Sequence, residues 1–206
     1  MAQDVIRLRP FEIDRVLVTL EGLPGSILVQ HQWSAKAKEQ LRQKHAGKKT
    51  KNRDIRDPQK EALEASYFTS KGARGIPAIT IKASLINAAH KDVGIEKTLV
   101  RKAVYIPAED PTGVLPFTSH SEPIMREDIV RVSNGQPDLR YRYAIDKWEL
   151  DMTAELVVEY LQLEDFVNLI NRAGFGVGLH EQRPEKGGDW GRFRVKDVSV
   201  QKGGKG

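Results

Sequence analysis

The chain has 206 residues, of which 39% are hydrophobic and none is cysteine, with 33 Lys or Arg against 28 Asp or Glu. This composition is typical of a globular protein with one domain, residues 1–206, that buries its core without a disulfide or a metal. The missing cysteines exclude a thiolate zinc site, an iron–sulfur cluster and a cysteine nucleophile.

The predicted elements of the first half begin with a strand over 15–20, whose apolar residues Val16, Val18 and Leu20 alternate with polar ones. Three helices follow, and they cover 33–44, 59–66 and 80–89. Asp57-Pro58 is a typical start for the second of them, and Gly94 ends the segment. We expect 34–75 to be a basic insertion of helix and loop.

The second half is predicted to begin with a strand over 97–106 and a long loop over 107–123. A short strand over 128–132 and a strongly alternating stretch over 139–160 come next. A helix over 163–173, capped by Gly174, precedes a last strand over 192–200 and a flexible tail over 201–206. This order predicts an α+β fold, a ferredoxin-like or RRM-like antiparallel sheet with helices on one face and the basic insertion.

Positive charge is concentrated between Lys36 and Lys60, which hold ten basic and three acidic residues and a local balance of +7. The other 181 residues sum to −2, because the whole chain carries +5. A basic block on a nearly neutral body is typical of a polyanion-binding surface, although a solvated lysine-rich loop would have the same composition. The block has too few large apolar residues to anchor on a membrane.

Arg140-Tyr141-Arg142-Tyr143 places its two arginines on one face of a strand and its two tyrosines on the other. Exposed tyrosines would stack bases, and exposed arginines would pair with phosphates. The simpler expectation puts the tyrosines in the core and the arginines in water.

Glycine and arginine are frequent between Arg172 and Phe193. Such a backbone can approach a ligand closely, so the segment is interpreted either as a loop that follows a phosphate backbone or as a helix cap and hairpin turn. It is not the dinucleotide-binding fingerprint, which needs a strand before it and a helix after it.

The five histidines are scattered, and none stands at metal-ligand spacing from another, so we expect no metal and no cofactor. His31 or His120 could serve as the general base of a metal-independent ribonuclease. A single histidine without a partner is more often structural.

Two segments resemble the RAMP superfamily, the repeat-associated proteins that build CRISPR effector complexes. One is Gly75-Ile76-Pro77-Ala78-Ile79-Thr80-Ile81-Lys82-Ala83-Ser84-Leu85, and the other is the glycine-rich stretch from Gly174 to Gly191 before the last strand. The chain departs from the superfamily at position 83, where Ala replaces the common Gly, and in a longer and more charged glycine loop. Over most of its length the chain is also similar to a group of bacteriophage proteins that share the words Met125-Arg126-Glu127-Asp128, Tyr141-Arg142 and Arg183-Pro184-Glu185-Lys186.

The resemblance implies a ferredoxin-like core, a single strand of nucleic acid held along the sheet and the basic insertions, and copies assembled side by side. It transfers no catalytic residue. The phage-like group further implies a phage-encoded protein in the cytoplasm of the host cell. The first ten residues carry Asp4, Arg7 and Arg9 instead of the apolar core of a signal peptide, and no stretch approaches the ~18 apolar residues of a membrane span, so we expect no membrane partner.

We therefore predict a protein that binds single-stranded RNA or DNA and is more a binding module than an enzyme. The expected contacts are all basic residues: Lys36, Lys38, Arg42, Lys44, Lys48, Lys49, Lys51, Arg53, Arg56, Arg74, Lys82, Arg140, Arg142, Arg183 and Arg192. A protein–protein module, either a virion component or an antagonist of a host defence complex, is the first alternative. A metal-independent endoribonuclease is the second.

Overall fold

The computed structural model describes residues 12–32, 42, 46, 56–131 and 135–201. Among these residues the main sheet has five strands, four of which follow the order β10-β1-β9-β4, while a short fifth strand pairs with β9. The four strands are β1 (Ile13–Gly22), β4 (Val104–Tyr105), β9 (Trp148–Val157) and β10 (Phe193–Gln201). Every neighbouring pair is antiparallel. Helices α3 (Ala78–Asp92) and α4 (Lys97–Ala103) lie between β1 and β4 in the chain, and α5 (Leu163–Arg172) lies between β9 and β10. This order is that of a ferredoxin-like core, so the predicted α+β class with an antiparallel sheet is confirmed.

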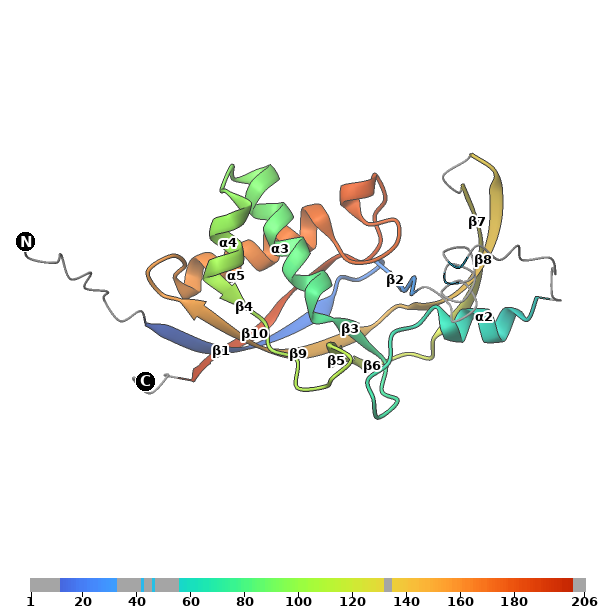
Figure 1. Cartoon of the computed structure of the whole chain (residues 1–206), viewed down its shortest axis with the longest axis horizontal. Coiled ribbons are helices and arrows are strands. Elements are labelled where there is room, and N and C mark those ends of the chain that lie inside the picture. The colour runs from blue at the N-terminus through green and yellow to red at the C-terminus, as the bar shows by residue number, and fades with distance from the viewer. Residues whose placement is uncertain (1–11, 33–41, 43–45, 47–55, 132–134, 202–206) are drawn as a thin grey trace, which may run out of the picture.

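The three helices cover one face of the main sheet (Figure 1). On β1 the alternation buries Val16, Val18 and Leu20 completely, and the intervening residues point to the opposite face. β9 alternates in the same way, with Leu150 and Met152 in the core. The period of two in these strands and the packed layer of helices thus explain why one face of the main sheet is buried and the other is exposed to solvent.

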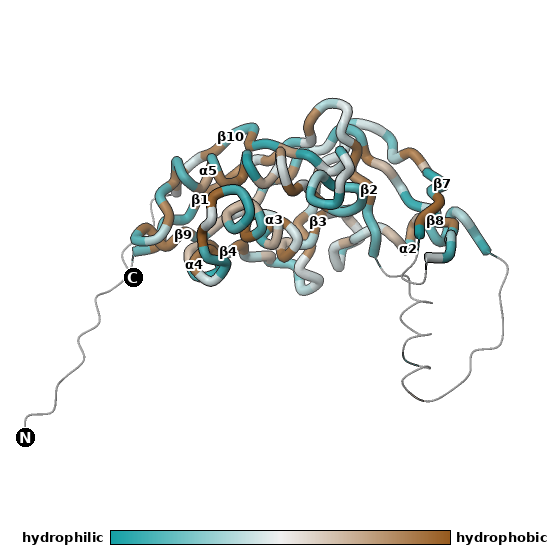
Figure 2. Tube along the Cα trace, turned by 90° about the horizontal axis from the view of Figure 1, so that it is seen from above, coloured by the Kyte–Doolittle hydropathy of each residue, from teal (hydrophilic) through white to brown (hydrophobic). Residues whose placement is uncertain are grey.

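A second antiparallel sheet has the order β2-β8-β7, formed by β2 (Leu28–Val29), β8 (Pro137–Ile145) and β7 (Ile124–Arg131). We call β7 and β8 the arm. Helix α2 (Pro58–Glu64) packs against β8. The strands β7 and β8 and the helix α2 extend the core at the end of the molecule away from the start of β1 (Figures 1 and 2).

The predicted start of α2 is confirmed, because the Asp57 side chain accepts a hydrogen bond from the backbone N–H of Lys60 at 3.1 Å and Pro58 begins the helix. The predicted helix over 33–44 lies outside the described residues except for Arg42. The tail beyond Gln201 also lies outside them.

The prediction of a strand over 97–106 is wrong for most of its length. Residues 97–103 form α4, whose buried Val100 and Ala103 are three positions apart and belong to the core. The β-branched residues around Val100 suggested a strand, but packing against α3 decides for a helix. The predicted loop over 107–123 also contains two short strands, β5 (Val114–Pro116), which pairs with β3 (Gly75–Pro77), and β6 (Thr118–Ser119), which pairs with β9.

The prediction that Gly174 ends the helix after β9 is wrong as well. The helix continues from α5 into a π-helix, η1 (Ala173–Val177), and the chain leaves it at Gly178 with φ of 72°. Gly174 is needed for close packing, because a Cβ there would lie 1.9 Å from the carbonyl oxygen of Phe193. Among the described residues, no helix is long and apolar enough to cross a membrane.

Candidate functional site

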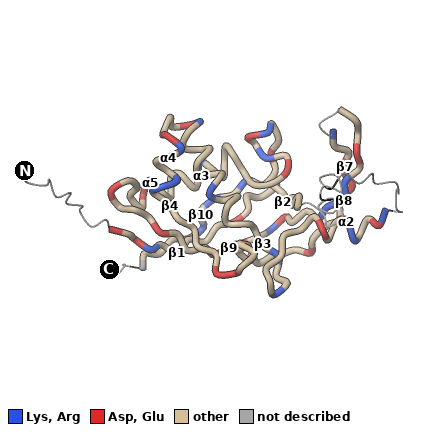
Figure 3. Tube along the Cα trace, viewed as in Figure 1, with Lys and Arg blue, Asp and Glu red and all other residues tan. Residues whose placement is uncertain are grey.

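The structure places about half of the predicted contact residues, because most of the basic block lies outside the described part of the chain. Those outside it are Lys36, Lys38, Lys44, Lys48, Lys49, Lys51 and Arg53. The described residues on either side of the segment contact α2 and β8: the backbone N–H of Gln32 donates to the carbonyl of Ala65 at the end of α2, and Arg56 donates to the carbonyl of Leu139 on β8. Figure 3 shows basic positions close together where α2 meets β7 and β8.

Two arginines stack on two tyrosines along one face of β8, and we call these four side chains the Arg–Tyr row. The guanidinium carbon of Arg56 lies 5.4 Å from the ring centroid of Tyr141, and that of Arg74 lies 4.7 Å from the centroid of Tyr143. Arg56 is neutralised by Glu61 at 2.6 Å and by Asp138 at 3.6 Å. Arg74 has no ion pair with any described residue, and its buried Nε has no hydrogen-bond partner there.

The other face of β8 carries Arg140 and Arg142, as the alternation predicted. Arg140 is exposed and pairs with Asp138 at 2.7 Å. The expectation that both arginines point to water is wrong for Arg142, which is 6% exposed and lies 3.2 Å from Glu181. The glycine-rich segment covers this face, and Glu181 compensates the buried cation. Tyr141 and Tyr143 are half-buried.

The remaining predicted contacts are divided between paired and unpaired cations. Lys82 donates to the carbonyl of Arg101 at 3.2 Å, and Arg183 pairs with Glu185 at 2.9 Å. Arg192 stacks over the exposed ring of Phe175 at 4.4 Å and, like Arg74, has no ion pair among the described residues.

The glycine-rich segment is folded closely on itself rather than open toward a ligand. A Cβ at Gly188 would lie 2.0 Å from the carbonyl oxygen of Gln182, and one at Gly191 would lie 1.9 Å from that of Leu179. These contacts favour the structural interpretation of the glycines over a loop that follows a phosphate backbone.

The open face of the main sheet is predominantly acidic. Three ion pairs cross it: Arg15 with Glu155, Arg194 with Glu21, and Lys196 with Glu149. Asp151 and Asp197 add two further carboxylates to this face. Carboxylates repel phosphates, so this surface argues against the expectation that nucleic acid lies along the main sheet. His120 also lies here, 3.3 Å from Glu149, and is therefore not part of the Arg–Tyr row.

The structure brings His31 beside a histidine that the sequence analysis did not single out. The ring centroids of His31 and His180 are 5.4 Å apart, and Tyr67 stacks on His180 at 5.3 Å. His180 is 3% exposed, and its backbone has φ of 60°, an uncommon value for a residue other than glycine. His31 and His180 are distant in the sequence, so no motif spacing could have connected them. We call the cavity beside these rings the histidine pocket.

Burial governs the electrostatics of this cluster. Burial, together with smaller effects of the neighbouring His31 and Arg183, lowers the pKa of His180 to about 3. Burial also lowers the pKa of His31, against the opposing effect of Glu181. Both rings are therefore neutral near neutral pH and offer one donor and one acceptor each.

This burial predicts a loss of stability in acid. An unfolded histidine takes up its proton near pH ~6.5, whereas folded His180 stays neutral down to about 3, so the unfolded state binds more protons between those values. The free energy of unfolding should fall by about 2 kcal/mol between about pH 7 and about pH 5 on account of His180 alone. Urea unfolding of His180→Asn should show a correspondingly weaker pH dependence, because Asn tolerates the left-handed backbone.

His90→Gln is the matched control, because His90 is exposed on α3. Its pH dependence should equal that of the original protein. An unchanged pH dependence in His180→Asn would contradict a neutral, buried His180.

The fold and these surfaces define a ferredoxin-like α+β protein with an arginine- and tyrosine-bearing arm, and the core implied by the RAMP resemblance is present. No protein-family model matches the chain, and no curated protein matches it. Among solved structures, it is similar to a chain in a cryo-EM structure of the type III-B Cmr-beta bound to cognate target RNA. The two are 12% identical with a TM-score of 0.47, and the likeness covers 92% of this chain but only 61% of that one. The strand order β10-β1-β9-β4 defines the fold independently of this likeness.

Proposed function

We propose that the protein binds single-stranded nucleic acid, RNA or DNA, along the side of the arm where α2 meets β8. The observation that carries the proposal is Arg74, a half-buried guanidinium stacked on Tyr143 with no anionic partner among the described residues. A cation held in place on an aromatic ring suits both a phosphate and the face of a base.

The basic block supports the same surface. The block from Lys36 to Lys60 carries a balance of +7. Its residue Arg56 donates to a carbonyl of β8, and Gln32, shortly before the block, is bonded to Ala65 at the end of α2. We assign phosphate contacts to this segment and stacking contacts to the Arg–Tyr row. With this assignment, the contacts between the basic block and the phosphates supply most of the binding affinity, and stacking on the Arg–Tyr row accepts any of the bases.

Assembly of copies side by side on one strand belongs to the same proposal. β7 forms an edge of the second sheet as far as the described residues extend, and on one face it exposes Met125 by 46% and Ile129 by 76%. An exposed apolar edge of this kind is suited to contact with another chain. More than one copy on a longer strand would be detected as a rising mass per oligonucleotide in light scattering.

Replacing Arg74 tests the observation on which the proposal rests. Arg74→Gln should weaken binding to labelled oligonucleotides of about 20 nucleotides by about tenfold, because it removes both a charge and a stacking plane. Fluorescence anisotropy with an RNA and a DNA of the same sequence measures the effect and also ranks the two ligands.

Arg194→Gln provides the control, because Arg194 is paired with Glu21 on the acidic open face. Its affinity should stay within about twofold of the original protein. Equal losses in the two variants would show that Arg74 has no local role, and the proposed surface would then be wrong.

A further inference from the structure

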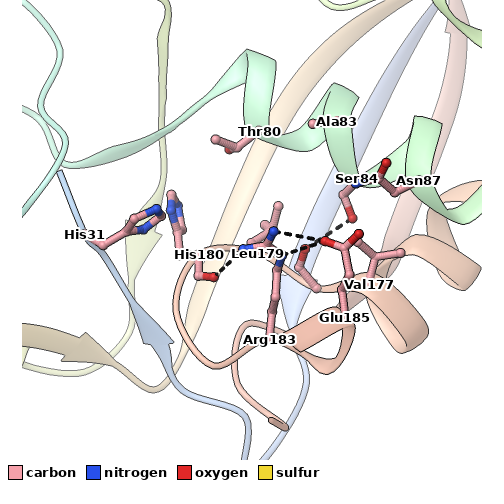
Figure 4. Close-up of a pocket in the computed structure, with 11 residues that line it drawn as sticks. His31, Thr80, Ala83, Ser84, Asn87, Val177, Leu179, His180, Arg183 and Glu185 are labelled. Atoms are coloured by element: carbon pink, nitrogen blue, oxygen red, sulfur yellow. Dashed lines mark hydrogen bonds and ion pairs between the residues drawn. The ribbon is translucent and has the colours of Figure 1, made fainter. Parts of the chain in front are cut away.

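The histidine pocket is a cavity of about 180 Å³ between α3 and the glycine-rich segment (Figure 4). Thr80, Ser84 and Asn87 line it from one face of α3, and His180 and Arg183 line it from the opposite wall. His31 lies next to the His180 ring at one end (Figure 4).

Several polar atoms of this pocket have no partner within the described chain. Both ring nitrogens of His180 and the Nδ1 of His31 are buried without a hydrogen bond to a described residue, and the half-buried Asn87 lines the same cavity. An unsatisfied buried polar group destabilises the fold, and the left-handed backbone of His180 is a second unfavourable feature at the same residue. Such costs concentrate at functional sites, where a ligand offsets them.

The two charged side chains that line the pocket, Arg183 and Glu185, form an ion pair. Arg183 pairs with Glu185 at 2.9 Å, and Glu185 also accepts from Lys91 at 2.8 Å. Arg183 additionally donates to the carbonyl of His180 at 3.0 Å, which holds the strained backbone in place. No unpaired cation of the described chain therefore lines the pocket, and a phosphate has no counter-charge there.

Neutral donors and acceptors beside aromatic rings suit a planar, uncharged heterocycle. His180 presents one donor and one acceptor, and the Asn87 amide presents both kinds as well. Tyr67 already stacks on His180 with an interplanar angle of 26°, which fixes the orientation of the ring. Unstacked nucleobases are recognised in this way, by hydrogen bonds along their edges next to aromatic side chains that include histidine.

The geometry points to the histidine pocket as the site of one nucleobase, unstacked from its neighbours in the bound strand. This inference rests on the proposed function, because the strand must pass the pocket. Gln30 connects the two surfaces: its side-chain amide donates to the carbonyl of Gly75 at 2.6 Å, next to Arg74, and its carbonyl accepts from the backbone N–H of Tyr67 at 3.2 Å. His31 follows Gln30 directly and leads into the basic block.

The pocket is tested on the full chain with free nucleosides and with oligonucleotides. In the first arm, adenosine, guanosine, cytidine and uridine are titrated into the protein while the imidazole Cε1–H resonances are followed by NMR. At least one nucleoside should shift the His31 and His180 signals, and the exposed His90 should stay unshifted. If none of the four nucleosides shifts the His31 and His180 signals, the inference is wrong, regardless of how any variant behaves.

In the second arm, His180→Asn should weaken binding to a strand of about 20 nucleotides by about tenfold, the effect of losing one stacked base, without changing the salt dependence. His90→Gln should bind normally.

Wild-type binding with the expected salt dependence and full affinity in His180→Asn would overturn the pocket alone. An absence of oligonucleotide binding, combined with nucleoside shifts at His180, would instead overturn the proposed function. Cleavage of RNA in EDTA that disappears in His31→Ala at unchanged affinity would also overturn the inference, because the rings would then be catalytic.

Discussion

Replacing Lys44, Lys48, Lys49 and Lys51 with glutamate is expected to weaken binding of single-stranded nucleic acid by at least about 100-fold at about 0.1 M salt. Each phosphate contact on a single strand contributes about 0.7 to the salt exponent, so the loss of four contacts removes close to three decades of affinity under these conditions. The free energy of unfolding should change by less than about 0.5 kcal/mol if these lysines are solvated. Anisotropy titrations and urea unfolding of the same variant measure the two quantities.

A control variant with the same change in net charge distinguishes a local phosphate contact from the overall electrostatic attraction between the protein and the nucleic acid. Arg101, Lys102, Lys147 and Arg172 are exposed outside the arm and its basic block, and their replacement by glutamate leaves the proposed surface intact. Screening beyond about 10 Å makes their effect on affinity much smaller. If the two variants lose the same affinity, the basic block is a solvated loop and not a contact surface.

Gly174→Ala is expected to lower the free energy of unfolding by about 3 kcal/mol. The added Cβ would lie 1.9 Å from the carbonyl oxygen of Phe193, a backbone atom at the first residue of β10, so the strand or η1 must move. Because β10 pairs with β1 along most of its length, this movement disturbs the core. Urea unfolding monitored by tryptophan fluorescence measures the loss.

Gly176→Ala is the matched control within the same π-helix. A Cβ there meets its nearest neighbour, Oδ2 of Asp92, at 3.4 Å, so the variant should be as stable as the original protein. Equal stability of Gly174→Ala would show that the glycine-rich segment is not closely packed, and an open, ligand-facing loop would then be the better interpretation.

The part of the fold that sequence could predict is the part decided locally. Alternation along β1 and β9 requires no knowledge of neighbours, because a period of two places one face inward. Asp57-Pro58 specifies the start of α2 through its own hydrogen bond to Lys60. The parity of β8 likewise separates Arg140 and Arg142 from the two tyrosines.

Tertiary packing decided the features that sequence could not predict. Residues 97–103 become helical because α3 offers a surface for Val100 and Ala103. Arg142 is buried because the glycine-rich segment brings Glu181 to it from a distant part of the chain. The pairing of His31 with His180 depends on the same segment and on a strained backbone, neither of which leaves a pattern in the residues nearby.

The salt dependence of binding tests the central claim most directly. A labelled single strand of about 20 nucleotides is titrated with the wild-type protein from about 50 to about 300 mM salt. If six to eight phosphates are neutralised, the logarithm of the affinity should fall against the logarithm of the salt concentration with a slope of roughly −4 to −6. An affinity that does not change with salt, or no binding at the lowest salt, would contradict a nucleic-acid-binding protein.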